Sequence, residues 1–276
     1  MRDERSAGTT AVLLATDFDG TIAPIVTIPE EACIHPLAAR LLEHCSALPE
    51  IAVAVISGRD VDDVRRRIGG VRAIVAGSHG LECVAPDGTV LWTEERRCPE
   101  LPPSLTRDAL HADLRIERKK YSFALHSRDV AGDPQQMKRV IAAVTSWADE
   151  HNLDVIGGRE VTEVRVRGGG KRAALRTIAA RYEPRGMVYA GDDITDFPAL
   201  AFAATHGRAI FVESEERTPP EIPGLWRVAR IEDLCFAFVR ALLEHVPGLA
   251  FDAGPHSVTE SVSSATESSP ERNTAR

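Results

Sequence analysis

Short apolar runs alternate with helix-like patterns over most of the chain. The runs in which nearly every residue is apolar lie at 11–16, 51–56, 71–76, 186–190 and 209–212. Continuous runs of this length are typical of strands that are buried on both faces. Apolar residues at helical spacing occupy the segments 36–47, 60–68, 171–182, 195–204 and 232–246. This alternation predicts an α/β fold with a doubly wound parallel sheet and helices on both of its faces.

Two regions depart from that alternation. Residues 81–84 and 89–92 flank Pro86-Asp87-Gly88, a turn sequence that predicts a hairpin. Further on, prolines interrupt 98–113, while 121–126 and 161–166 alternate like half-exposed strands around a predicted helix at 133–147. We therefore expect a core formed by 1–97 and 168–250, an inserted α+β domain at 98–167, and a disordered tail at 251–276. The tail is predicted to be disordered because it is rich in Ser, Thr and Glu and nearly free of aromatic residues.

Composition excludes several classes of protein. The 276 residues are 43% hydrophobic and 27% charged, which rules out a fibrous or mostly disordered chain. A net charge of -8 gives the chain no overall basic character that would favour nucleic acid or anionic lipid. Apolar runs are far shorter than the ~18–20 residues of a membrane span, and the N-terminus lacks the apolar stretch of a secretory signal.

The cysteines indicate the redox environment of the protein, but the sequence carries no signal of its assembly. Five cysteines without CxxC spacing predict reduced thiols in a cytoplasmic protein rather than a zinc site or a disulfide framework. No pattern in the sequence indicates an oligomeric state.

Asp17 and Asp19 are the clearest candidates for chemistry. They end the first apolar run, in Asp17-Phe-Asp-Gly-Thr21. Side chains at positions i and i+2 of a strand point the same way, so both carboxylates are expected to face the crevice where α/β sheets bind ligands. The repulsion between two adjacent carboxylates is relieved most readily by a bound cation or by protonation of one of them. The alternative is a simple Asp-Gly turn, whereas an EF-hand is excluded because Thr21 and Ile28 stand where that loop needs acidic side chains.

Three more acids follow a later apolar run. Asp192, Asp193 and Asp196 lie within Gly191-Asp-Asp-Ile-Thr-Asp196. Crowding three carboxylates is unfavourable unless a metal ion or a helix N-terminus offsets their charge. The pattern is therefore compatible with a metal site and equally with an Asx turn that caps the next helix.

Ser57 and Lys171 complete the set of polar residues near strand ends. Ser57 directly follows the run at 51–56, where a hydroxyl beside free helix N–H groups suits an anion. A serine-hydrolase elbow is excluded because Val55 stands where that motif needs glycine. Lys171 follows three glycines, but Arg165 and Arg172 occupy positions where a phosphate-binding P-loop needs Gly and Ser or Thr. Taken alone, Lys171 has the pattern of a solvated surface residue.

Taken together, Asp-x-Asp-Gly-Thr, Ser, Lys and Asp-Asp in this order resemble the haloacid-dehalogenase (HAD) phosphatase superfamily over about residues 11–246. Within that superfamily the chain is similar to the trehalose-6-phosphate phosphatases. The segments that carry this similarity are Asp17-Phe-Asp-Gly-Thr-Ile-Ala-Pro-Ile25, Ile56-Ser-Gly-Arg59, Gly77-Ser-His-Gly-Leu-Glu82, Glu117-Arg-Lys-Lys120, His126-Ser-Arg128 and Gly191-Asp-Asp-Ile-Thr-Asp196. The resemblance implies a Rossmann-like core with residues 98–167 as a cap.

The resemblance also implies roles for the core residues. Asp17 would be the nucleophile that forms an aspartyl-phosphate, and Asp19 the general acid and base. Mg²⁺ would be held by Asp17, the Asp19 carbonyl and Asp192. Ser57 and Lys171 would bind the phosphoryl oxygens, while Asp193 and Asp196 would orient the metal shell or Lys171.

For the cap, the resemblance implies that Glu117, Lys119 and Glu163 contact the sugar. Other residues of the shared segments, Arg59, His79, His126 and Arg128, are expected to line the substrate site. The alternative for residues 118–120 is a solvated basic face. Ser127, Val166 and Phe197 depart from the family pattern, which usually has an aromatic residue, a proline and an acid at these positions.

The sequence therefore predicts a Mg²⁺-dependent phosphatase that converts trehalose 6-phosphate to trehalose. Its expected partner is a small sugar phosphate, with no nucleic acid and no membrane. Two alternatives remain at this point. One is a HAD phosphatase for another sugar phosphate, such as sucrose phosphate or glucosylglycerol phosphate, and the other is an inactive sensor with the same fold. The intact Asp17, Asp19, Lys171 and Asp192 disfavour the sensor, because a binding protein gains nothing from a nucleophile.

Overall fold

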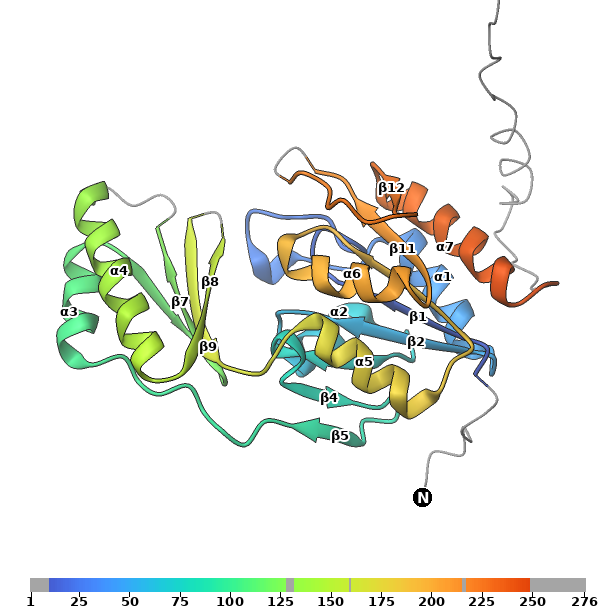
Figure 1. The fold of residues 1–276 in the computed structure, drawn as a ribbon, viewed down its shortest axis with the longest axis horizontal. Helices are drawn as coiled ribbons and strands as arrows, with labels where there is room; N and C mark the ends of the chain where they lie inside the picture. The colour runs from blue at the N-terminus through green and yellow to red at the C-terminus, as the bar shows by residue number, and fades with distance from the viewer. Residues whose placement is uncertain (1–9, 128–131, 159, 215–216, 249–276) are drawn as a thin grey trace, which may run out of the picture.

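An eight-stranded sheet forms the centre of the larger unit of the protein (Figure 1). The computed structural model describes residues 10–127, 132–158, 160–214 and 217–248. The sheet has the order β12-β11-β10-β1-β2-β3-β4-β5; its first six strands are parallel, and β4 and β5 form an antiparallel hairpin at one edge. The strands are β1 Val12–Thr16, β2 Ile51–Ile56, β3 Ile74–Gly77, β4 Glu82–Val84, β5 Val90–Thr93, β10 Gly186–Gly191, β11 Gly207–Val212 and β12 Trp226–Val228.

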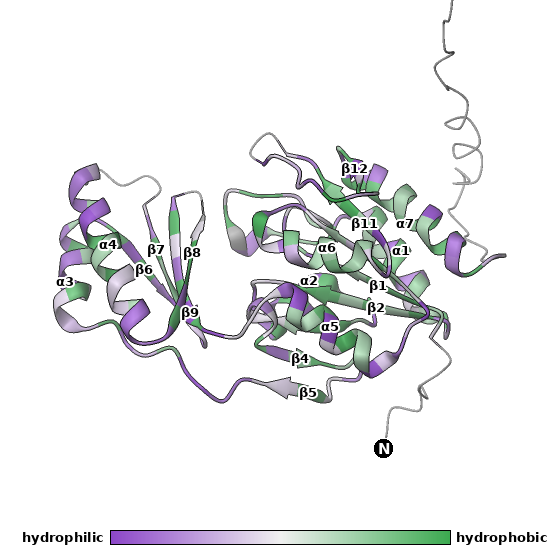
Figure 2. Ribbon diagram, in the orientation of Figure 1, coloured by the Kyte–Doolittle hydropathy of each residue, from purple (hydrophilic) through white to green (hydrophobic). Residues whose placement is uncertain are grey.

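Helices cover both faces of this sheet. They are α1 Pro36–Ala47, α2 Val61–Ile68 and α7 Ile231–His245 on one face, and α5 Lys171–Tyr182 and α6 Phe197–Ala204 on the other. Alternate side chains of β1 enter the two separate apolar cores, Leu14 on the side of α1 and Leu13 on the side of α5. Figure 2 shows the central strands coloured mainly as hydrophobic. The doubly wound α/β fold predicted from the alternation of strands and helices is confirmed.

A smaller unit is inserted between β5 and α5. Its antiparallel sheet has the order β6-β7-β9-β8, and helices α3 and α4 cover the face that points away from the larger unit (Figure 1). The elements are α3 Pro103–His111, β6 Arg115–Arg118, β7 Ser122–His126, α4 Pro134–Glu150, β8 Leu153–Gly158 and β9 Val161–Val166. Phe123, Leu125 and Val164 pack against the two helices, which leaves the opposite face of the sheet without a helical cover.

The proline-rich segment at 98–113 contains a helix that the sequence pattern did not predict. Helix α3 begins at Pro103, a position at which the missing N–H of proline is harmless and its fixed φ favours a helix. Strands β6, β8 and β12 were also missed, because their short, partly polar sequences lack apolar periodicity. Strand β7 is more buried than its alternation suggested, since it lies between β6 and β9 and carries small or apolar residues on both faces.

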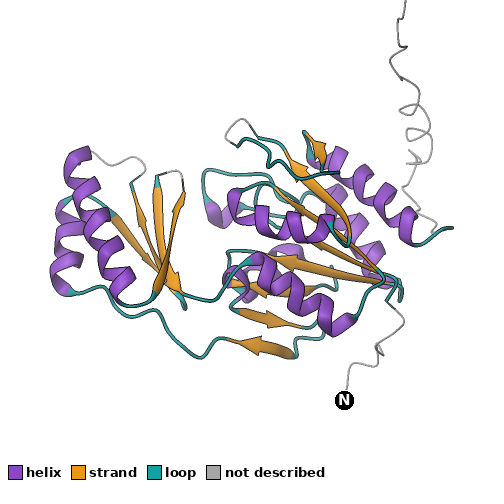
Figure 3. Cartoon of the chain, viewed as in Figure 1, coloured by secondary structure: helices purple, strands orange, loops and turns teal. Residues whose placement is uncertain are grey.

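Two chain segments connect the units, one before α3 and one between β9 and α5 (Figure 3). They are joined by the side chain of Arg96, whose Nη2 donates to the carbonyl of Arg167 at 2.8 Å. Three one-turn helices complete the described elements: η1 Pro29–Glu31, η2 Ser78–Gly80 and η3 Ile194–Asp196. The predicted tail at 251–276 lies outside the described residues. Across the described ranges, every helix is too short or too polar to span a bilayer.

Candidate active site

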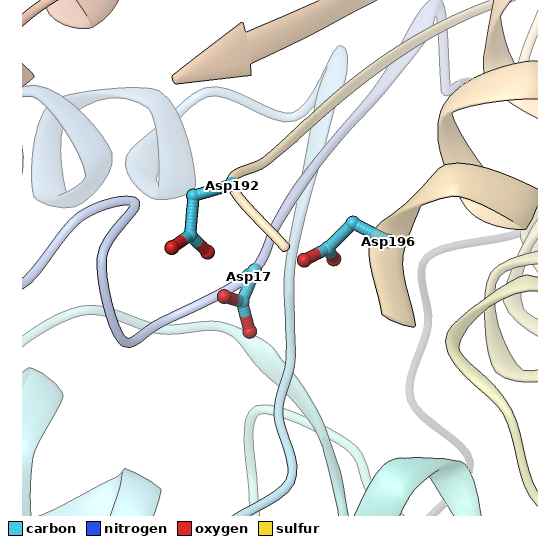
Figure 4. Close-up of side chains that lie close together, drawn as sticks. All are labelled: Asp17, Asp192 and Asp196. Carbon is cyan, nitrogen blue, oxygen red and sulfur yellow. The ribbon is translucent and has the colours of Figure 1, made fainter. Parts of the chain in front are cut away.

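Three buried carboxylates converge where β1 and β10 end. Asp17 follows β1, and its backbone N–H donates to the carbonyl of Ala190 on the neighbouring strand at 2.9 Å. Asp192 follows β10, and Asp196 ends the one-turn helix η3. Oxygens of Asp17, Asp192 and Asp196 lie within 4.8 Å of one another, and Figure 4 shows the three side chains pointing toward a common point. The parallel sheet thus brings together two motifs that are 175 positions apart (192 − 17).

Lys171 is buried beside this cluster. Its Nζ lies 2.7 Å from Oδ1 of Asp17 and 2.9 Å from Oδ1 of Asp196. Burial disfavours the ammonium ion, but the two carboxylates outweigh it and raise the pKa of Lys171 above its ordinary value. Lys171 is therefore a charged site residue, and the interpretation of a solvated surface lysine is wrong.

Asp196 has its hydrogen-bonding capacity filled by protein groups. Its carboxylate accepts from Lys171 through both oxygens, from the hydroxyl of Tyr189 at 2.5 Å, and from the backbone N–H of Asp193 at 3.2 Å. Gly191 permits this packing, because a Cβ there would lie 2.3 Å from the Asp196 carboxyl carbon. With so many donors engaged, Asp196 is suited to holding Lys171 in place rather than to binding a metal ion.

Asp17 and Asp192 have the properties of metal ligands. Burial, with a smaller contribution from neighbouring carboxylates, raises the pKa of Asp17 well above its ordinary value despite the adjacent Lys171. Burial and the charge of Asp196 likewise raise the pKa of Asp192 to about 7. A divalent cation between them would remove this penalty, and an all-oxygen donor set suits Mg²⁺. Gly20 allows the Asp192 side chain to lie close to the loop after β1, since the φ of Gly20 is +76° and a Cβ there would lie 2.1 Å from Oδ2 of Asp192.

Asp19 does not join the carboxylate cluster. Its two oxygens accept a forked pair of hydrogen bonds from Arg59, at 2.7 Å from Nε and 2.8 Å from Nη2. Arg59 also donates to Asp63 at 2.9 Å. Burial lowers the pKa of Arg59, but these hydrogen bonds and charges raise it by more, so the guanidinium is charged. Arg59, which was expected to line the substrate site, is thus bound to Asp19 in this structure.

Ser57 and His79 lie on neighbouring loops at the same edge of the sheet. Ser57 directly follows β2, is buried, and accepts the backbone N–H of Arg59 on its hydroxyl at 3.1 Å. The backbone N–H of His79 donates to the carbonyl of Ser57 at 2.9 Å. Ser78, His79 and Gly80 all have positive φ, at 51°, 55° and 85°, a strained turn of the kind concentrated at functional sites.

The uncovered face of the smaller sheet carries the predicted sugar-binding residues. Strand register places Glu117, Ala124 and Glu163 in one row across β6, β7 and β9, so the two carboxylates share a face with only a methyl group between them. Glu117 pairs with Nε2 of His126 at 2.8 Å. Ser122 donates to Glu163 at 2.6 Å.

Glu163 also connects the two units. Its Oε2 lies 3.4 Å from Nε2 of His79, and its Oε1 lies 3.9 Å from Nζ of Lys119. Burial raises the pKa of Glu163, but the partners His79, Lys119 and Ser122 outweigh it and bring the pKa to about 2. Burial in turn lowers the pKa of His79. Glu163 is therefore ionised at neutral pH and faces the larger unit.

A second connection between the units was not anticipated. Lys120 donates to Glu82 on β4 at 2.7 Å, and the hydroxyl of the buried Tyr121 lies 2.8 Å from that of Thr93. Glu82 accepts as well from Ser78 and from the backbone of Val61, at 3.1 Å and 3.2 Å. The sequence contained Glu82 and Lys120 within recognised segments, but only the fold shows that they pair with each other.

The remaining predicted residues, and the positions that depart from the family pattern, can be placed as follows within the described residues. Asp193 caps η3 and pairs with Arg217 at 2.5 Å, whereas Arg128 lies outside the described residues. Of the three departures from the family pattern, Val166 donates its backbone N–H to Tyr121 at 3.0 Å, a bond that proline could not make. Phe197 packs edge-on against Phe211 with ring centroids 6.0 Å apart. Ser127 donates its N–H to the carbonyl of Glu160 at 2.8 Å.

Comparison with known proteins decides the family. The sequence profile described as trehalose-phosphatase matches residues 15–216. The chain belongs to the trehalose-phosphatase family. It is 32% identical over 247 residues to the trehalose-phosphate phosphatase of Mycobacterium tuberculosis (strain H37Rv), an alignment that covers 83% of this chain and 61% of that protein. The chain thus spans about three fifths of the length of this curated relative.

Solved structures show the same fold. The C-terminal domain of the C. albicans trehalose-6-phosphate phosphatase superposes with a TM-score of 0.66 at 20% identity, covering 82% of this chain and 90% of that one. A haloacid dehalogenase-like hydrolase from Bacteroides thetaiotaomicron gives a TM-score of 0.64 at 13% identity, covering 84% and 99%. The fold is therefore that of the HAD superfamily, as the family resemblance implied.

Proposed function

We propose that this protein is a phosphoric monoester hydrolase that releases phosphate from trehalose 6-phosphate through an aspartyl-phosphate on Asp17. The observation that carries the proposal is the placement of Asp17 at the end of β1, 2.7 Å from the buried Lys171 and beside Asp192. The cation at this point favours binding of an anionic substrate, and the carboxylate beside it can act as the nucleophile. The reaction named in the mycobacterial and fungal relatives is consistent with this chemistry.

In this proposal Asp17 and Asp19 divide the reaction between them. The carboxylate of Asp17 attacks phosphorus, the bond to the sugar oxygen breaks, and Asp19 protonates the departing oxygen. Asp19 then takes a proton from water, which attacks the aspartyl-phosphate and releases inorganic phosphate. Because Asp19 is held by Arg59 here, it has to turn away from that guanidinium and take up a proton before it acts as an acid.

Ser57 and Lys171 are assigned to the phosphoryl oxygens. The Ser57 hydroxyl is buried at the same sheet edge, and because it accepts the N–H of Arg59, its own O–H can be donated to a phosphoryl oxygen. Lys171 contributes positive charge, held in position by Asp196. In a buried site, such fixed donors stabilise the charge that develops in the transition state.

The metal assignment follows the donor chemistry. We propose that Asp17, the carbonyl of Asp19 and Asp192 hold Mg²⁺, which would neutralise the nucleophile and the phosphoryl oxygens. Asp193 is proposed to orient this shell through its place in η3.

Removal of the metal should abolish activity. Excess chelator is expected to lower phosphate release to background, because Asp17 and Asp192 then repel each other and the anionic substrate. Added Mg²⁺ should restore the rate, while Zn²⁺ should be a poorer replacement for an all-oxygen site. Full turnover in excess chelator would refute the metal role of Asp192.

The proposed cap, residues 98–167, is assigned to recognition of the sugar. Glu117 and Glu163 stand in one row of its uncovered face, with Lys119 and His126 beside them. Carboxylates bind pairs of sugar hydroxyls well, and a lysine suits an anionic substrate. His79 of the larger unit and Arg128 are further proposed contacts of the substrate, and residues 1–97 and 168–250 form the proposed core.

Cap variants should separate recognition of the sugar from chemistry at phosphorus. Glu117→Ala, Lys119→Ala and Glu163→Ala are each expected to lower kcat/KM for trehalose 6-phosphate about ten- to a hundredfold, because a sugar hydroxyl loses its partner. Hydrolysis of p-nitrophenyl phosphate, which has no sugar, should change little. Glu150→Ala, at the exposed end of α4, is the matched control. Equal losses on both substrates would contradict the assignment of these residues to the sugar.

A substrate panel distinguishes the alternatives. A strong preference for sucrose phosphate or glucosylglycerol phosphate would leave the proposed mechanism unchanged and identify a different sugar phosphate as the substrate. Binding of sugar phosphates without phosphate release would favour the inactive sensor. The five free cysteines are consistent with the proposed cytoplasmic location, where thiols stay reduced.

A further inference from the structure

A cavity of about 520 Å³ lies between the smaller unit and the N-terminal ends of α5 and α6. Its walls come from β8 and β9 on one side and from residues 169–173, Arg176, Thr195 and Pro198 on the other. Asp17, Asp19, Ser57 and Asp192 do not line it, so it adjoins the candidate active site without coinciding with it. His79 and Lys171 belong to both.

All the charged side chains that line the cavity are basic. They are Arg165, Lys171, Arg172 and Arg176, and of these Lys171 is already paired with Asp17 and Asp196. Arg172 and Arg176 are one helical turn apart on α5, where like charges destabilise a helix. Neither guanidinium forms an ion pair or hydrogen bond with any of the residues that the structure describes. Both side chains are exposed, so their charges are available to an anion that enters the cavity, and an anion between them would relieve their mutual repulsion.

Arg165 provides an independent observation from the other side of the cavity. Its side chain on β9 is buried, with 9% of the residue exposed. Its Nε has no hydrogen-bond partner in the described structure, while its Nη2 forms a long ion pair with Oδ2 of Asp154 at 3.9 Å. A buried guanidinium N–H without an acceptor is costly, and an oxygen of a bound anion would satisfy it.

The first turn of α5 adds backbone donors to the same space. The helix has 12 residues and begins at Lys171, and its N-cap Gly170 offers no side-chain acceptor. The N–H groups of the first turn are therefore available, and Ala173 lies in the cavity wall. A helix N-terminus of this kind favours phosphate-like anions.

We infer that this cavity is a second anion-binding site, which takes a tetrahedral oxyanion such as phosphate or sulfate. Because Arg165 belongs to the smaller unit and Arg172 and Arg176 to the larger one, a single anion bound by all three ties β9 to α5 across the linker at 167–170. The inference concerns binding only and does not depend on the proposed reaction. The ligand is either a free inorganic anion or the phosphoryl group of a phosphorylated sugar.

Calorimetric titration with sodium sulfate tests the site. The double variant Arg172→Gln/Arg176→Gln is expected to weaken sulfate binding at least about tenfold, because two charge-assisted contacts are removed. Arg181→Gln, on the same helix but outside the cavity, should bind as the wild type does. Arg172, Arg176 and Arg181 are all exposed, and unchanged melting curves of the two variants would show that the fold is intact.

Ser57→Ala separates this site from the catalytic centre. Sulfate binding that persists in Ser57→Ala and is lost in the double arginine variant supports the inference. The opposite pattern would overturn it, because the anion would then sit beside Asp17. Glucose 6-phosphate and inorganic phosphate distinguish the two ligand sources: tighter binding of the sugar phosphate favours a phosphorylated metabolite, and equal binding favours the free anion.

Hydrogen exchange tests the link between the units. Sulfate should slow amide exchange in residues 167–170 of the wild type and leave it unchanged in the double arginine variant. Sulfate binding without any slowing of exchange in this segment would overturn the proposed bridge.

Discussion

Asp17→Asn is expected to lower phosphate release from trehalose 6-phosphate by more than about 10³-fold, because an amide cannot form the acyl-phosphate. The fold should be retained. Asparagine is nearly isosteric, and it removes one of three carboxylates that lie within 4.8 Å of one another. Lys171 keeps its second partner, Asp196, at 2.9 Å. Initial rates of phosphate release and a thermal melt on the same preparation measure both effects.

The control for this variant is Asp62→Asn, an exposed aspartate in the first turn of α2. It makes the same chemical change outside the site and should leave the rate within about twofold, as surface substitutions generally do. Asp19→Asn should also be severely impaired, but it retains the nucleophile and so can still form the phospho-enzyme slowly. Near-normal turnover by Asp17→Asn would disprove the mechanism.

Lys171→Ala should damage both activity and stability. Loss of a fixed positive charge at the phosphoryl group is expected to lower the rate about 10²–10³-fold. Unlike the cap variants, it should affect trehalose 6-phosphate and p-nitrophenyl phosphate alike, because both present the same phosphoryl group. Removing the ammonium also leaves Asp17 and Asp196 buried without a counter-charge, which costs about 3–5 kcal/mol of folding free energy.

Chemical denaturation and parallel assays on the two substrates check this prediction. Lys138→Ala, an exposed lysine on the outer helix α4, is the control and should alter neither quantity. A Lys171→Ala protein that is as stable as the wild type would show that the buried ion pairs contribute no net stability. A rate loss confined to trehalose 6-phosphate would place Lys171 with the sugar instead of the phosphate.

Local sequence information was sufficient for the core of the fold. Continuous apolar runs such as 51–56 identified strands buried on both faces, and α1 and α5 have the predicted bounds. Strand periodicity alone placed Asp17 at a carboxyl end. The family resemblance, now confirmed, supplied the connection between Asp17, Lys171 and Asp192. Helix α3 escaped prediction because proline at the first position of a helix looks, in sequence, like proline that interrupts one.

Pairings between distant segments were decided only by the tertiary structure. Asp19 with Arg59, Glu163 with His79 and Glu82 with Lys120 each join residues far apart in the chain. No local pattern encodes such contacts, because they depend on how strands and loops are placed relative to one another.

The sequence by itself therefore determined the doubly wound core, the strand-end carboxylates and the family. The tertiary structure decided which of those carboxylates meet, that Asp196 holds Lys171, and that Arg165, Arg172 and Arg176 line one cavity. The physical reason is that local chain geometry and burial set the secondary structure. The electrostatic environment of a side chain, in contrast, is set by neighbours that only folding brings within a few ångströms.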